Sequence, residues 1–251
     1  MSAPGNVGRP PEYAAPALEK GLDVLELLAD APGPLSQSEV AAALGRSVGQ
    51  LFRVLTTLER RGYVVRTEEG GYLLSVRLFD LASRHAPLRG LLAASAAPMR
   101  ALAEALGQSC NLGVREGDTV RVVAQAESPT PFGFVVRVGS TFPLDQTLTG
   151  EVLLAFTADQ DGMGRASDSL GTIRQRGFGE RGDSLHPGIT DVAAPIVGPD
   201  GRALAALTVP YVATSYSAGG LDQVRARLRE AATDISRALG GRASAPAGSP
   251  R

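Results

Sequence analysis

Residues 36–61 read SQSEVAAALGRSVGQLFRVLTTLERR, and this stretch decides how the N-terminal part of the chain folds. It opens with a capping box, in which the Ser36 hydroxyl accepts a hydrogen bond from a helical amide and a glutamate three residues later reaches back. Apolar residues at helical spacing follow, and Gly45 stands where a helix ends. A second serine cap comes next. The stretch therefore predicts two helices, 36–44 and 47–61, joined by a short turn.

The segments on both sides extend this pattern. Leucines recur at helical spacing between residues 18 and 28, and the run PGP at 32–34 ends that first helix. After the third helix, two short apolar segments flank a glycine-containing loop at 67–71, which is typical of a β-hairpin. Three helices followed by a hairpin make a winged helix-turn-helix, which we expect over residues 17–75.

The third helix has the two faces that DNA recognition requires. Leucines at 51, 55 and 58 share one face, and small and basic residues occupy the opposite one. Between residues 45 and 66 the sequence has five arginines and one acidic residue, so positive charge is concentrated where phosphates would lie. Arg53 can reach a guanine edge or a phosphate. The expected DNA-contacting residues are Ser36, Gln37, Arg46, Ser47, Gly49, Gln50, Arg53, Thr56 and Arg66.

The remainder of the chain mixes strands and helices. Strands are expected at 110–115, 120–126, 134–138, 189–197 and 203–211, and helices at 88–106, 149–157, 168–176 and 220–239. Short strands joined by hairpins and flanked by helices predict an α+β fold around an antiparallel sheet. The expected order is a disordered tail (1–16), the winged helix-turn-helix (17–75), a linker helix (76–87), the α+β domain (88–240) and a second disordered tail (241–251).

Composition excludes several classes of protein. The chain has 251 residues, 43% of them hydrophobic, and a net charge of −1, so it can bury a real core. Its single cysteine, Cys110, cannot form an internal disulfide, which favours a reducing compartment. No apolar run reaches the ~18 residues of a membrane span and no signal peptide is visible, so we expect a cytoplasmic protein without a membrane partner.

Catalysis is not expected. The sequence has no nucleophile elbow, P-loop or dinucleotide fingerprint, so no cofactor is predicted. His186 stands next to Ser184 and Asp183, but neighbouring loop positions do not by themselves make a catalytic triad. Cys110 lies in an apolar strand pattern, where an inert buried thiol is expected.

Four blocks of sequence carry a resemblance to a known family. They are the stretch from ALEKGLDVLELL to GGYLL at 17–74, VGSTFPLDQTLTGEVLLAF at 138–156, RGFG at 176–179 and GITDVAAPIVGPDGRALAALTVP at 188–210. In this order and spacing they resemble the IclR family of bacterial transcriptional regulators. The resemblance implies a winged helix-turn-helix joined by a helix to a GAF-like, antiparallel sheet sandwich that binds a small-molecule effector. It also implies homodimers or homotetramers on palindromic double-stranded operators, with a repressor among the expected roles.

The resemblance also implies where an effector binds. The start of the helix near residue 148 suits an anion, because first-turn amides point outward there. Further walls come from two strands and the loop before them. The implied effector-binding residues are Leu148, Thr149, Gly150, Arg181, Asp191, Thr208 and Pro210.

Three positions depart from the family pattern. Glu151 stands where many relatives have lysine, Asp191 where a cysteine or another small residue is common, and Pro210 where serine is common. Two acidic residues thus lie near a site that elsewhere receives acids. We hypothesise a neutral or cationic ligand, or no high-affinity ligand; the alternative is that both acids face solvent. A second alternative for the whole chain is a sensor or adaptor that does not bind DNA.

Overall fold

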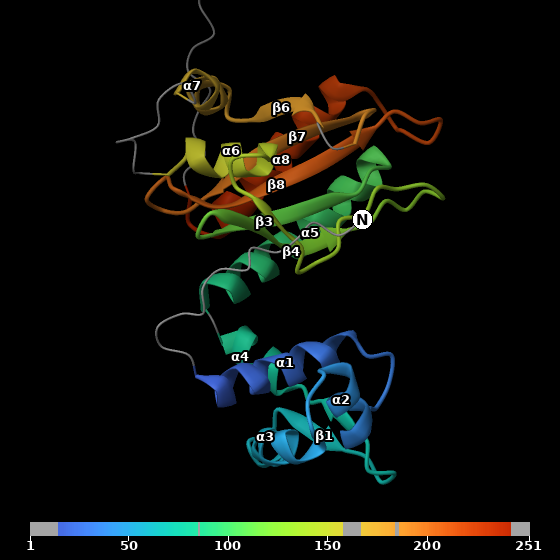
Figure 1. The fold of residues 1–251 in the computed structure, drawn as a ribbon. Coiled ribbons are helices and arrows are strands. Elements are labelled where there is room, and N and C mark those ends of the chain that lie inside the picture. Colours follow the sequence, from blue (N-terminus) through green and yellow to red (C-terminus); the bar gives the residue numbers. More distant parts are fainter. Residues whose placement is uncertain (1–14, 85, 158–166, 184–185, 242–251) are drawn as a thin grey trace, which may run out of the picture. The chain divides into compact units, whose positions relative to one another are not determined.

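The chain divides into two units, residues 1–85 and 86–251 (Figure 1). The computed structural model describes residues 15–84, 86–157, 167–183 and 186–241, so the two expected tails lie almost wholly outside the described residues. The division falls within the segment 76–87 that we expected to link the domains. Among the described residues, no helix combines the length and the apolar character that crossing a membrane requires.

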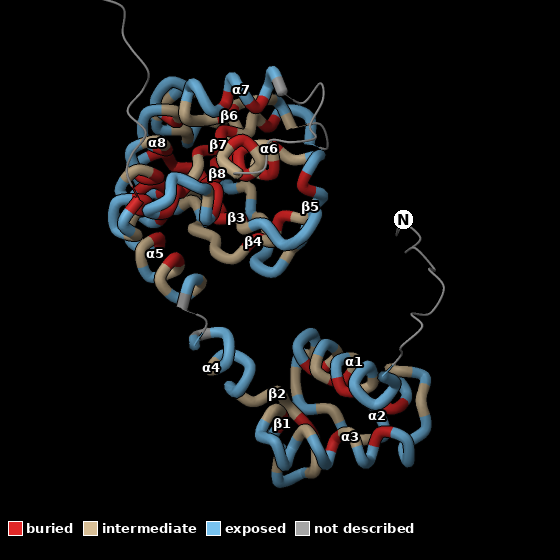
Figure 2. The backbone as a smooth tube through the Cα atoms, turned by 90° about the vertical axis from the view of Figure 1, so that its left-hand side faces the viewer, coloured by how far each residue is buried: buried red, intermediate tan, exposed pale blue. Residues whose placement is uncertain are grey.

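The first unit has the three helices and the hairpin that the sequence predicted. In chain order its elements are α1 (Pro16–Asp30), α2 (Gln37–Ala43), α3 (Val48–Arg60), β1 (Val64–Arg66), β2 (Tyr72–Leu74) and α4 (Arg77–Arg84). The two strands pair antiparallel, and Leu35 adds a bridge to Tyr72. The predicted winged helix-turn-helix is therefore confirmed. Figure 2 shows α4 as mostly exposed along its described length.

Local signals in the sequence set the helix ends. The capping box is present, with the Ser36 amide donating to Glu39 Oε2 at 2.7 Å and the Glu39 amide donating to Ser36 Oγ at 3.3 Å. Gly45 and Gly62, with φ of 60° and 75°, adopt the left-handed conformation that ends α2 and α3. Apolar residues from all three helices and the hairpin then pack into one core: Val24, Leu28, Val40, Ala41, Leu51, Leu55, Val64 and Tyr72.

The second unit is built on a six-stranded antiparallel sheet. Its strand order is β5-β4-β3-β8-β7-β6. The strands are β3 (Cys110–Glu116), β4 (Thr119–Ala126), β5 (Thr141–Pro143), β6 (Gly179–Gly182), β7 (Ile189–Val197) and β8 (Ala203–Val212). The helices are α5 (Ala86–Leu106), α6 (Leu148–Ala155), α7 (Ser167–Arg176) and α8 (Leu221–Ala238). The predicted α+β class with an antiparallel sheet is confirmed.

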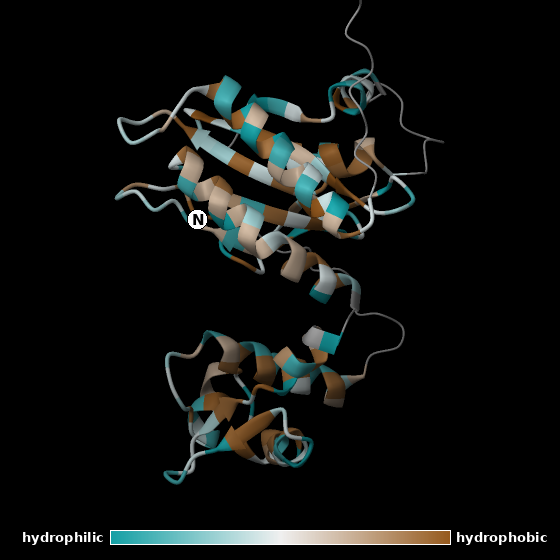
Figure 3. Cartoon of the chain, turned by 180° about the vertical axis from the view of Figure 1, so that it is seen from behind, coloured by the Kyte–Doolittle hydropathy of each residue, from teal (hydrophilic) through white to brown (hydrophobic). Residues whose placement is uncertain are grey.

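Helices cover both faces of this sheet, and side-chain alternation along the strands decides which residues each face receives. On β8, Leu207 and Val209 pack in the cluster formed with α5 and α8, whereas Ala206 packs in the cluster formed with α6 and α7. The paired strand repeats this alternation, with Val192 in the first cluster and Ala193 in the second. Figure 3 shows brown and paler segments alternating along these strands.

The expected strand at 134–138 is wrong. The alternation holds for four residues, because Phe134 and Val136 are half-buried while Val135 and Arg137 are exposed, and it ends at the exposed Val138. This segment nevertheless joins no ladder in the described chain, and the strand β5 lies a few residues later at Thr141–Pro143. The alternating side chains of this segment thus result from its packing along a pocket of this unit and not from pairing with a strand.

Two further differences concern local sequence. The sequence did not predict β6, because its four residues, GERG, lack an apolar alternation and the strand lies at the sheet edge. Helix α5 begins at Ala86, two residues before the expected start, so Pro87 lies inside its first turn. A proline is tolerated there because first-turn amides have no partner within the helix.

Substitution of Gly150 tests how closely α6 packs on the preceding loop. A Cβ at this position would lie 1.8 Å from the Leu144 carbonyl oxygen, so Gly150→Ala must displace the helix or the loop. We expect the free energy of unfolding to fall by at least ~2 kcal/mol in urea titrations. The matched control is Gly171→Ala, at an exposed position of helix α7 with nothing within 4 Å of its Cβ, which should be neutral or stabilising. Equal effects of the two substitutions would contradict this packing.

Candidate functional site

Helix α3 presents an exposed polar face. Leu51 and Leu55 are fully buried, and this fixes the rotation of the helix. Gly49, Arg53 and Thr56 on the other side are all exposed. No described residue pairs with the Arg53 guanidinium, so it can contact an external partner. The surface formed by Ser47, Gly49, Gln50, Arg53 and Thr56 is here called the recognition face.

The other expected DNA contacts have roles within the fold. Gln37 Nε2 donates to the Val48 carbonyl at 3.2 Å and so ties α2 to the start of α3. Arg46 Nη2 pairs with Asp23 Oδ2 on α1 at 2.8 Å, and its Nε is buried without a partner. Arg66 is exposed on β1, with its guanidinium over the Tyr72 ring. Contacts of these residues with DNA stay predictions.

Sequence reasoning missed two apolar residues beside the recognition face. Val48 and Phe52 are exposed to 44% and 56%, one helical turn apart. The apolar periodicity of the helix had pointed only to the buried leucines. Exposed apolar side chains at this spacing give α3 a surface that can contact another molecule.

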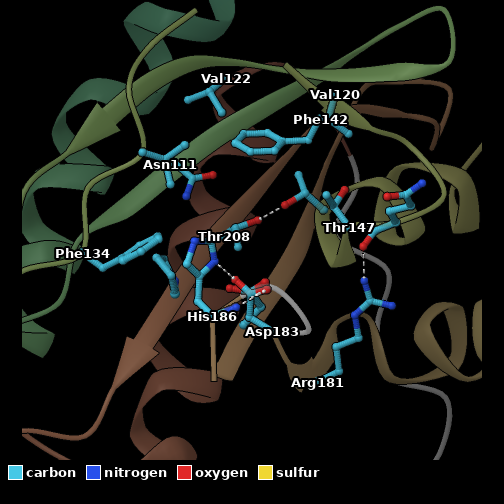
Figure 4. A pocket seen from close by; sticks show the side chains of 15 residues that line it. Asn111, Val120, Val122, Phe134, Phe142, Thr147, Arg181, Asp183, His186 and Thr208 are labelled. Atoms are coloured by element: carbon cyan, nitrogen blue, oxygen red, sulfur yellow. Dashed lines mark hydrogen bonds and ion pairs between the residues drawn. The ribbon is translucent and has the colours of Figure 1, made fainter. Parts of the chain in front are cut away.

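The second unit contains a pocket between the sheet, the start of α6 and the segment that carries Phe134 (Figure 4). Its lining residues are Asn111, Val120, Val122, Phe134, Val136, Phe142, Gln146, Thr147, Thr149, Arg181, Asp183, His186, Asp191, Thr208 and Pro210. Apolar and aromatic side chains from β4 and β5 form one wall. Polar and charged groups from β6, β7 and the loop between them form the opposite one.

Five of the seven expected effector residues line this pocket. They are Thr149, Arg181, Asp191, Thr208 and Pro210. Leu148 and Gly150 do not line it. Leu148 is only 2% exposed and packs in the apolar cluster around α6, and Gly150 packs against the Leu144 carbonyl. These two residues can contribute only backbone to the site.

The pocket also contains residues that the sequence analysis did not select. Asn111 on β3 pairs in register with Thr208 on β8, which places both side chains on the same face of the sheet. Phe134 and Val136 line the pocket from the segment that had been predicted as a strand. Only the pairing of strands distant in sequence brings these residues together, so no local signal could have found them.

Charges in the pocket are arranged in two pairs. Arg181 forms an ion pair with Glu151 and donates from Nη2 to the Gln146 carbonyl at 2.6 Å. His186 Nδ1 lies 2.8 Å from Asp183 Oδ2, and its ring meets Phe134 edge to face at 5.3 Å. Ser184, the third member of the triad considered above, lies outside the described residues.

Asp191 is the unusual acid of the site. Burial raises the pKa of its carboxyl to about 6, and the charge of Asp183 adds to this, while Arg181 and His186 act in the opposite direction. No described residue donates a hydrogen bond to the Asp191 carboxylate. The alternative that both acids face solvent is therefore wrong, because Asp191 lines the pocket and Glu151 holds Arg181.

The only cysteine is not suited to catalysis. Cys110 is fully buried, its thiol donates to the Met99 carbonyl at 3.4 Å, and desolvation raises its pKa to about 12. A thiol in this state is a poor nucleophile. The described residues also contain no cluster of three or more histidine, cysteine or acidic side chains that could hold a metal ion.

Each of the two units matches a known family model. The family model of the IclR helix-turn-helix domain matches residues 17–68, and the model of the bacterial transcriptional regulator IclR C-terminal domain matches residues 87–166 and 163–237. The chain belongs to the IclR family.

Named relatives and solved structures extend over nearly the whole chain. The transcriptional regulator BhcR of Paracoccus denitrificans is 27% identical, over 92% of this chain and 90% of its own. KdgR of Escherichia coli, also a transcriptional regulator, is 25% identical over 81% of this chain and 85% of its own. Among solved structures, Thermotoga maritima IclR has a TM-score of 0.70 at 24% identity, covering 89% of this chain and 98% of its own.

A neutral residue at position 191 should stabilise this IclR-family chain. Ionisation of Asp191 lowers the free energy of unfolding, because its pKa is higher in the folded chain than in the unfolded chain. This loss of stability develops as the pH rises from about 4 to about 6 and persists in full above pH 6. Asp191→Asn removes it, so the free energy of unfolding should rise by roughly 1–3 kcal/mol at pH 8 and hardly at all at pH 4. Thermal melts at both pH values measure this difference.

The control is Asp145→Asn, which neutralises an exposed acid in the loop before α6. Its effect on the melting temperature should be small and similar at both pH values. A destabilising effect of Asp191→Asn at pH 8 would contradict the burial argument.

Proposed function

We propose that the chain is a sequence-specific DNA-binding regulator of transcription whose operator binding is modulated by a small molecule in the pocket of its second unit. The recognition face on α3 carries the first half of this proposal, because it is exposed, contains an arginine that no described residue pairs with, and has buried leucines on its opposite side. The helix-turn-helix match and the regulator names of the relatives support it.

The pocket carries the second half of the proposal. It combines an apolar wall with a few polar groups, which is the usual composition of a small-molecule site. A neighbour in fold, an IclR homologue from Microbacterium hydrocarbonoxydans with a TM-score of 0.72 at 20% identity, was solved in complex with 4-hydroxybenzoate. A protein of this fold can thus hold a small organic molecule.

A two-fold homodimer, or a tetramer built from dimers, fits this role. Two recognition helices related by a two-fold axis would read a palindromic operator, with half-sites about 10 base pairs apart or a multiple of that. The effector would favour one arrangement of the second units, and α4, which follows the hairpin, would transmit it to the DNA-binding pair. A ligand can shift DNA affinity only by its differential affinity for the two arrangements. No catalytic step is part of this function, and a cytoplasmic location accords with it.

Replacing Arg53 should weaken operator binding. We expect Arg53→Ala to raise the dissociation constant by about 5- to 150-fold in gel shifts on the DNA upstream of the chain's own gene, since a base contact contributes ~1–3 kcal/mol. Affinity of the unsubstituted chain should fall steeply as salt rises.

The control is Arg202→Ala, which removes an exposed arginine from the turn before β8. It should leave the gel shift unchanged. A folded chain that binds no promoter fragment even at low salt would overturn the DNA-binding proposal and leave the sensor without DNA binding.

A further inference from the structure

We propose that the pocket of the second unit selects a small organic amine, with its ammonium group at Asp191 and a second polar group bound by Asn111. This inference rests on the proposed function, because it names the ligand class of the same pocket. Three observations on the described residues carry it: an amide in the pocket wall that none of them bonds, an arginine already paired with a glutamate of the chain, and an acid to which none of them donates a hydrogen bond.

The unpartnered amide belongs to Asn111. Its side chain is 6% exposed, lines the pocket and points into it in Figure 4. No described residue makes a hydrogen bond with this side chain. The cross-strand neighbour Thr208 has its hydroxyl engaged with Thr149 at 2.8 Å, and the amide atoms of the other neighbour, Gln125, are buried without any partner. An amide that lines a pocket and whose hydrogen-bonding capacity no described residue uses can be complemented by a polar group of a ligand.

The arginine of the pocket is not available to an acid. Arg181 is held by the Glu151 carboxylate and by the Gln146 carbonyl. An incoming carboxylate would have to displace Glu151, and would also lie near Asp183 and Asp191. The charged groups that act on Asp191 are Arg181, its register partner on β6, and Asp183 with His186 in the loop after β6. Glu151 on α6 acts through its ion pair with Arg181.

Formal charges at the site therefore add up to a negative pocket. Arg181 and Glu151 cancel, Asp183 and Asp191 contribute −2, and His186 contributes zero or +1, so the sum is −2 or −1. Asp191 has an acceptor carboxylate that no described residue satisfies. An ammonium group placed there makes a charge-assisted hydrogen bond in a partly buried site, which is stronger than the same contact in water.

The sheet also sets the length of the ligand. Asn111 lies on β3 and Asp191 on β7, with β8 between them, and their partners on β8 are Thr208 and Pro210. Two strand spacings and one two-residue step separate their backbones by about 10–12 Å. The side chains of Asn111 and Asp191 take up part of this distance. The ligand therefore needs a chain or ring of about four to six atoms between its ammonium group and its second polar group. Phe142 and Val122 provide the apolar wall along it.

Calorimetry on the purified full chain tests the inference. The probes are primary amines of three to eight carbons, aliphatic and aromatic, with and without a second hydroxyl group, each compared with the compounds of the same length in which an alcohol or a carboxylate replaces the amine. We expect at least one hydroxyl-bearing amine to bind ten or more times more tightly than its matched alcohol and carboxylate. Equal or tighter binding of the carboxylates, or no binding of any amine at millimolar concentration, would overturn it.

Three substitutions assign the preference to named residues. Asp191→Asn should abolish the amine preference while the chain stays folded, since this change removes the buried charge. Glu151→Gln should free Arg181 and raise carboxylate affinity relative to amine affinity. Asn111→Leu should remove the benefit of the second polar group, and Asp145→Asn, on the exposed loop, should change none of these values.

The pH dependence of amine affinity is an independent test of the role of Asp191. Amine affinity should fall about tenfold between pH 7.5 and pH 5, because protonation of the Asp191 carboxyl, whose pKa is raised to about 6, removes the acceptor charge. An amine preference unchanged across this range would count against Asp191 as the binding residue. Gel shifts without ligand report the DNA-binding proposal separately, so either proposal can fail alone.

Discussion

The pairing of β8 between β3 and β7 is the constraint on which the second unit depends. Its register sets Asn111 opposite Thr208 and Asp191 opposite Pro210. Because side chains alternate along a strand, this register also sends the two residues on either side of Thr208, Leu207 and Val209, into the core against α5 and α8. A shift by one residue would exchange the pocket floor for the core, so the site and the stability of the sheet are fixed together.

The two faces of this sheet differ in polarity. The face against α5 and α8 is apolar and accounts for much of the buried core. The face toward α6 carries a half-buried acid and an amide that no described residue bonds, and both features oppose stability unless a ligand satisfies them. Pockets that bind ligands commonly retain such unsatisfied groups at the expense of stability, and here they are concentrated on one side of the sheet.

In the first unit, the core has to hold the recognition face of α3 toward solvent. A small three-helix core must hold one helix face outward, and it does so with leucines on α3, a capping box on α2 and the ion pair between Arg46 and Asp23. The arginines near the turn therefore differ in role: Arg46 fixes the position of α1, while Arg53 has no partner among the described residues. Local positive charge in the sequence does not distinguish an anchoring arginine from a contacting one.

The sequence by itself determined what depends on near neighbours along the chain. Caps, left-handed glycines and helical or alternating periodicity fixed the winged helix-turn-helix and most strands, because hydrogen bonds and side-chain directions in these elements span only a few residues. The tertiary structure decided what depends on distant partners. Whether the alternating segment at 134–138 finds a strand, whether Arg181 is free or held by Glu151, and which side chains join Asp191 in one pocket follow from strand pairing and packing. Those contacts join residues that are tens of positions apart in the sequence, so no pattern among near neighbours predicts which of these residues meet.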